Sequence, residues 1–161
     1  MDVDHKELEI RAHRVLDEYG ITKPVVDVSK IAAGEGVKIV ETEMPSMYKN
    51  VAGFYDEKRK TIFIAKNDEP HRKLFSVAHE LGHIILNHRH ATVQFRITHS
   101  DERYPKEESE ANSFAVHLLV PEFMLREYME KYSLSKFDYE ELAKIFGVSF
   151  TTMRHALSRL N

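Results

Sequence analysis

The chain of 161 residues contains no cysteine, and it has only six glycines and five prolines. The absence of cysteine excludes disulfide frameworks, iron–sulfur clusters, cysteine-containing zinc fingers and thiol nucleophiles. Any catalytic or metal-binding chemistry must therefore use nitrogen and oxygen atoms. The low glycine and proline counts, together with nine phenylalanines and seven tyrosines, argue against disorder and predict a globular chain with a core of its own.

The chain also lacks a strong charge excess and long apolar runs. Its net charge is −3, so no overall field draws it to nucleic acid or to an anionic membrane. A membrane span needs about 18 consecutive apolar residues, and no such run occurs. The first seven residues are rich in acids and have no apolar segment of the kind found in signal peptides. We therefore expect a cytoplasmic protein that does not associate with membranes.

Hydrophobic periodicity predicts an α+β fold, with helices first, then a small and mostly antiparallel sheet, then more helices. We expect residues 1–132 to form the main domain and residues 133–161 to form a helical hairpin packed on it. The predicted helices cover residues 7–19, a short stretch after Asp27, and residues 67–87, 107–119, 121–132, 137–146 and 149–160. The predicted strands cover residues 37–40, 51–55 and 61–65, and residues 89–105 are predicted to be mostly loop.

Six of the ten histidines fall between His71 and His99, and two of them form the pattern H-E-x-x-H. His79 and His83 are four residues apart on the predicted 67–87 helix, so both imidazoles can reach one metal ion with bonds of about 2.0–2.1 Å. Glu80 lies beside them, where it can take a proton from a metal-bound water. A solvated or core-packed pair of histidines is the alternative, but the helical setting after a hairpin favours one zinc ion.

A catalytic zinc ion needs a third protein ligand. The metzincin arrangement is excluded because Leu86 and Arg89 stand where its glycine and third histidine belong. A glutamate from the predicted 107–119 helix is the other common solution. Helical phase favours Glu108, since Ala111, Asn112 and Ala115 share its face and would let the two helices approach closely. Glu110 is the second choice, and a solvated acidic helix start is the alternative.

Other polar residues are candidates for supporting roles. Asn112 could accept a hydrogen bond from the non-ligating N–H group of a zinc-bound histidine. His88 and His90 are interpreted as solvent-facing loop residues. The strand over residues 61–65 is a candidate for pairing with an extended substrate. A group that stabilises the oxyanion should also be present, and the candidates for it are Tyr104, His99 and His88.

The C-terminal segment offers a different class of function. Residues 142–160 read as helix, turn and helix, with Ala143 and Gly147 at positions typical of a DNA reader. The balanced charge of this segment argues against a strong phosphate contact. The alternative hypothesis is a non-catalytic DNA- or protein-binding regulator that uses this segment.

The chain resembles the ImmA/IrrE metallopeptidase family in two segments, the run from Leu74 to Leu86 and the run from Glu108 to Pro121. The resemblance implies a zincin-like core of the gluzincin type, one zinc ion held by His79, His83 and Glu108, and Glu80 as the catalytic glutamate. It further implies site-specific cleavage of a partner protein, typically a helix-turn-helix repressor of a mobile element or stress response. The repressor would then be a separate polypeptide, and a second protein could activate cleavage.

Overall fold

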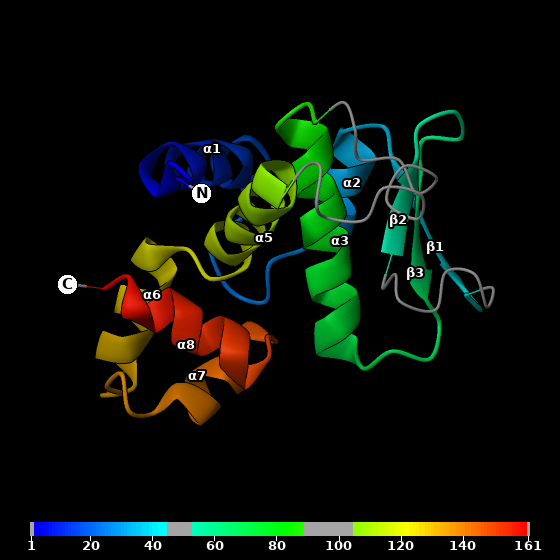
Figure 1. The fold of residues 1–161 in the computed structure, drawn as a ribbon. Helices are drawn as coiled ribbons and strands as arrows, with labels where there is room; N and C mark the ends of the chain where they lie inside the picture. Colours follow the sequence, from blue (N-terminus) through cyan, green and yellow to red (C-terminus); the bar gives the residue numbers. More distant parts are fainter. Residues whose placement is uncertain (1, 45–52, 89–104, 161) are drawn as a thin grey trace.

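The computed structural model describes residues 2–44, 53–88 and 105–160 of the chain (Figure 1). The helices are α1 (His5–Glu18), α2 (Val28–Gly34), α3 (Pro70–Ile85), α5 (Pro105–Leu119), α6 (Glu122–Lys131), α7 (Tyr139–Phe146) and α8 (Phe150–Ser158). The strands are β1 (Lys38–Thr42), β2 (Gly53–Asp56) and β3 (Thr61–Ala65). This arrangement confirms the predicted α+β class.

The helix boundaries follow from local capping chemistry. Asp4, Asp27 and Ser149 each accept a hydrogen bond from the backbone N–H three residues later, at the starts of α1, α2 and α8. Gly147 ends α7 with φ of 69°, a left-handed conformation in which glycine carries no steric penalty. The predicted helices agree with these boundaries to within a few residues.

The sheet is mixed rather than mostly antiparallel. Its strand order is β1-β3-β2, in which β2 pairs antiparallel with β3 and β1 pairs parallel with β3. The sequence pattern revealed the β2–β3 hairpin, but it could not show that β1 joins the second strand of that hairpin, which runs in the same direction. As a result, β3 is the central strand and both of its sides are paired.

Helix α3 lies in the middle of the molecule (Figure 1). It contacts β2, β3 and α2 on one side and packs most extensively on α5, which in turn packs on α1. The carboxyl-terminal helices α6, α7 and α8 gather beside the end of α5 that is remote from Glu108 (Figure 1). Side chains from α3 and α5 can therefore meet where these two helices face each other.

The core is continuous from α1 to α8. Among its fully buried side chains are Leu16, Ile62, Leu81, Phe114 and Phe146, which come from five different elements. No helix in the described parts of the chain is both long and apolar enough to cross a bilayer.

Candidate metal centre

Helix α3 brings two imidazoles together. His79 and His83 are one turn apart, and their Nε2 atoms lie 3.1 Å from each other. Their ring centroids are 4.7 Å apart and the ring planes are nearly perpendicular, at 85°. The two nitrogen atoms therefore converge on one point although the rings do not stack.

Helix α5 contributes a carboxylate to the same point. Glu108 places Oε2 at 3.1 Å from the Nε2 atom of His79 and Oε1 at 3.0 Å from the Nε2 atom of His83. In the described parts of the chain, these three residues form the group of potential metal ligands whose donor atoms all lie within 4.8 Å of one another. The structure thus brings together the three candidate ligands that the sequence suggested.

The donor set fits a zinc ion. Bonds of 2.0–2.1 Å at tetrahedral angles separate ligand atoms by about 3.3 Å, close to the separations of 3.0–3.1 Å seen here. Two histidines and one glutamate are a known ligand set of catalytic zinc, which leaves one coordination position for water or substrate. A closed structural site would need a fourth protein ligand. Among the described residues the group supplies three protein ligands, which is the number found in catalytic zinc sites.

The two helices can approach closely because small residues meet between them. A Cβ atom added at Gly82 would lie 3.2 Å from the carbonyl oxygen of Ala111 and 3.2 Å from Cδ1 of Phe114. Ala111 and Ala115 are fully buried. Of the three residues predicted to form the small face of α5, Ala111 and Ala115 therefore lie in the interior, whereas Asn112 is exposed.

Glu80 follows His79 on α3 and is only 1% exposed. The side chain of His79 is 13% exposed, and its ring lies against that of Phe75 with centroids 6.5 Å apart. A buried carboxylate next to a metal ligand is shielded from bulk water, which strengthens its interactions with charged or polar groups in the site. The position of Glu80 is compatible with the role of general base.

His88 is not a solvent-facing loop residue, as the sequence suggested, because its side chain is only 6% exposed. Its Nδ1 atom lies 2.9 Å from the Nδ1 atom of His83, and its Nε2 atom lies 2.9 Å from Oε2 of Glu110. Glu110, the second choice for the third ligand, therefore contacts His88 while Glu108 faces the metal-binding atoms. Sequence reasoning missed this pair because it predicted where the helix ends but not the turn that brings His88 back toward His83.

The structure does not support the supporting roles suggested for Asn112 and for the strand over residues 61–65. Asn112 is exposed on α5, and the contact to the Nδ1 atom of His83 comes from His88. His90, His99 and Tyr104 lie outside the described residues. The strand Thr61–Ala65 is the central strand β3, and its pairing with β1 and β2 excludes it as a free edge for substrate.

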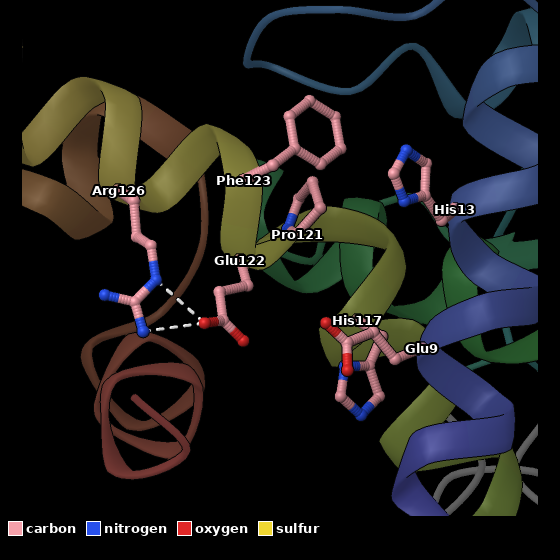
Figure 2. A pocket seen from close by; sticks show the side chains of 7 residues that line it. All are labelled: Glu9, His13, His117, Pro121, Glu122, Phe123 and Arg126. Atoms are coloured by element: carbon pink, nitrogen blue, oxygen red, sulfur yellow. Dashed lines mark hydrogen bonds and ion pairs between the residues drawn. The ribbon is translucent and has the colours of Figure 1, made fainter. Parts of the chain in front are cut away.

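A separate pocket of about 370 Å³ lies between α1 and α6 (Figure 2). On one side the rings of His13 and Phe123 stack, with centroids 4.9 Å apart. On another side Arg126 pairs with Glu122 through Nε and Nη2, at 2.8 and 2.7 Å. None of the described residues that line this pocket belongs to the metal group.

The comparisons with known proteins identify the family of the chain. The family described as the IrrE N-terminal-like domain, peptidase family M78, matches residues 32–158. The chain therefore belongs to this metallopeptidase family, which confirms the resemblance seen in the sequence.

Two individual proteins are similar to the chain. The uncharacterized immunity region protein 2 of Bacillus phage phi105 is 33% identical over 107 residues, which make up 64% of this chain and 63% of the phage protein. A Mycobacterium tuberculosis transcriptional regulator superposes with a TM-score of 0.69 at 21% identity, covering 97% of this chain and 47% of that protein. At that identity the second match shows a shared fold. The chain spans less than two thirds of the length of each of these proteins.

Proposed function

We propose that the chain is a zinc-dependent endopeptidase that cleaves a partner protein, a helix-turn-helix transcriptional repressor, and so releases the genes which that repressor controls. One observation carries the proposal: His79, His83 and Glu108 converge from two helices in a chain that belongs to a metallopeptidase family. The absence of a cysteine ligand supports an open, catalytic site over a closed, structural one.

The chemistry follows from the positions of the side chains. His79, His83 and Glu108 would hold one zinc ion, which when bound acts as a Lewis acid and lowers the pKa of a coordinated water toward 7. Glu80 accepts the proton of the attacking water and later returns it to the nitrogen of the leaving amine. Its burial shields this carboxylate from competing solvent.

The nature of the substrate is supported by the family and by the phage relative. The name of that relative places it in an immunity region, which agrees with a substrate that represses genes of a mobile element. We further propose that cleavage takes place in the cytoplasm, where such repressors act. An activating protein is compatible with this scheme.

The test combines metal content with cleavage of co-expressed candidate repressors. Glu80→Gln should bind one zinc ion per chain as the wild type does, but should lose cleavage by at least about 10²-fold, because the proton acceptor is gone. Glu108→Ala should lose the zinc. Glu127→Gln, an exposed carboxylate on α6, is the matched control and should behave as wild type. Cleavage by Glu80→Gln at the wild-type rate would overturn the proposal.

The same samples test the alternative function. Salt-dependent retention of the wild type on DNA, with every candidate repressor left intact, would support a regulator that uses α7 and α8 as a helix-turn-helix. Zinc bound by the wild type together with repressor cleavage and no DNA retention supports the peptidase.

A further inference from the structure

The carboxyl end of α3 turns back so that His88 lies beside the metal group. Asn87 has a left-handed backbone with φ of 57°. The N–H groups of Asn87 and His88 donate to the carbonyl oxygens of Ile84 and His83, at 3.1 and 2.9 Å. These two hydrogen bonds are those of a Schellman motif, in which asparagine is tolerated at the left-handed position. The helix cap thus fixes His88 next to His83.

A chain of hydrogen bonds links the metal-facing histidine to a carboxylate. The Nδ1 atoms of His83 and His88 are 2.9 Å apart, and Nε2 of His88 is 2.9 Å from Oε2 of Glu110. The other carboxylate oxygen, Oε1, has the Lys106 ammonium group 3.8 Å away. His83 on α3, His88 just beyond the end of that helix and Glu110 on α5 therefore form one continuous series of hydrogen bonds.

The direction of the hydrogen bonds follows from the metal site. If Nε2 of His83 gives its lone pair to a metal, the ring proton is on Nδ1, which must donate to Nδ1 of His88. His88 then carries its own proton on Nε2, and this N–H group points to Glu110, whose ionised carboxylate can only accept. Each donor meets an acceptor, so this series of hydrogen bonds is consistent with one tautomer of His83 and one of His88.

Because His83 and His88 are buried, water cannot easily replace the hydrogen bonds of this series. The side chains of His83 and His88 are 1% and 6% exposed, while that of Glu110 is 24% exposed. The Nδ1 atom of His79 offers a contrast, because it is buried without a hydrogen-bond partner among the described residues. Of the two metal-facing histidines, His83 is therefore the one whose Nδ1 atom has a hydrogen-bond partner among the described residues.

We propose that His88 and Glu110 are positioning residues that fix the ring orientation and tautomer of His83 and thereby raise the affinity of the site for its metal ion. This inference rests on the proposed metal site. It extends the site beyond the three candidate ligands to His88, which contacts His83, and to Glu110, which contacts His88. Partners of this kind also make the ligand nitrogen a stronger electron donor.

The test is metal affinity measured by competition with a chelator, on the full chain and without any substrate. His88→Ala should bind zinc about 10–100-fold more weakly than wild type. His88→Gln should recover most of this loss, because its amide offers an acceptor to His83 and a donor to Glu110. Glu110→Ala should weaken binding in the same direction. His155→Ala, an exposed histidine on α8, is the control and should bind as wild type.

Cobalt substitution provides a second measurement, which would not change if His88 contributed only to the stability of the fold. At saturating Co²⁺, the visible d–d absorption of His88→Ala should differ from that of wild type, and His88→Gln should restore it. Unchanged zinc affinity and an unchanged cobalt spectrum in folded His88→Ala would overturn the inference. If His88→Ala does not fold, Glu110→Ala tests the same series of hydrogen bonds at its other end, by the same two measurements. A wild type that binds no metal would instead contradict the proposed function itself.

Discussion

The Arg159 guanidinium, at the end of α8, donates a hydrogen bond from Nη1 to the Nε2 atom of His117 in the last turn of α5, at 3.1 Å. Since a guanidinium has no acceptor, Nε2 of His117 must carry a lone pair, and the imidazole is neutral. Burial, followed by the positive charges of Arg159 and His5, lowers the pKa of His117 to about 4 from its ordinary value of 6.5. The contact thus ties the C-terminal helices to the core and also depends on protonation.

This contact predicts that the protein loses stability as the pH falls from about 6.5 to about 4. Across that interval the unfolded chain binds a proton at His117 that the folded chain does not, so protonation favours unfolding. Above pH 6.5 the stabilising contribution is complete. One histidine can account for a slope of at most about 1.4 kcal/mol per pH unit. The measurement is urea unfolding of the metal-free protein at several pH values, because metal release is itself linked to protons.

The control for this experiment is His117→Gln, which can still accept from Arg159 but does not titrate. Its free energy of unfolding should vary less with pH over the same interval than that of wild type. His5 contributes in the same direction, since burial also lowers its pKa, and His5→Gln should remove a smaller part of the slope. Identical pH profiles for wild type and His117→Gln would contradict the assignment.

A second prediction concerns the boundary near residue 132. Phe146 on α7 is fully buried, and its ring meets that of Tyr128 on α6 edge to face with centroids 5.9 Å apart. Phe146→Ala should therefore cost about 3–5 kcal/mol of global stability. Phe137→Ala, at a residue that is 80% exposed, should change stability by less than about 0.5 kcal/mol. Thermal unfolding should show one transition in each variant, whereas two transitions would mean that residues 133–161 fold as a separate unit.

Much of this architecture can be predicted from the sequence because it depends on local rules. The aspartate at position 27 and the glycine at 147 mark helix ends by their own chemistry, and the H-E-x-x-H spacing fixes the histidines on one helix face. The preference for Glu108 over Glu110 rested on the small residues near Glu108 along the helix, and in the structure Glu108 lies with His79 and His83. These inferences need only the neighbours along the chain.

The inferences that failed depend on partners far along the chain. The side chain of His88 is buried by its contacts with His83 and Glu110, and the second of these residues is 22 positions away. β1 pairs with β3 instead of continuing an antiparallel sheet, and no local pattern distinguishes these two outcomes. Asn87 before His88 was the available signal, since asparagine is a common left-handed residue at helix ends.

A third prediction concerns Gly82, at the closest approach of α3 and α5. Ala favours a helix interior by about 1 kcal/mol over Gly, but the added Cβ would press on the backbone oxygen of Ala111 at 3.2 Å. Overpacking typically costs about 1–3 kcal/mol. Gly82→Ala should therefore lower stability by up to about 2 kcal/mol and weaken zinc binding, because Glu108 moves with α5.

The matched control for Gly82→Ala is Arg72→Ala, an exposed position on the same helix. It should leave both the midpoint of unfolding and the zinc affinity close to wild type. A Gly82→Ala variant that is more stable than wild type and binds zinc equally well would show that the two helices separate at no cost. The spacing between them would then not determine the geometry of the ligands.

The last prediction decides which residue supports a metal-facing histidine. Asn112 was proposed from the sequence to accept a hydrogen bond from a ligand histidine, but it is exposed, and His88 lies against Nδ1 of His83. Asn112→Ala should therefore change zinc affinity by less than about 2-fold, whereas a true supporting partner would cost about 10–100-fold. Stability should change by less than about 0.5 kcal/mol, with a slight gain expected from the higher helix propensity of alanine. Chelator competition on Asn112→Ala and His88→Ala, side by side, makes the comparison. A large loss in the Asn112 variant and none in the His88 variant would reverse the roles given to these two residues.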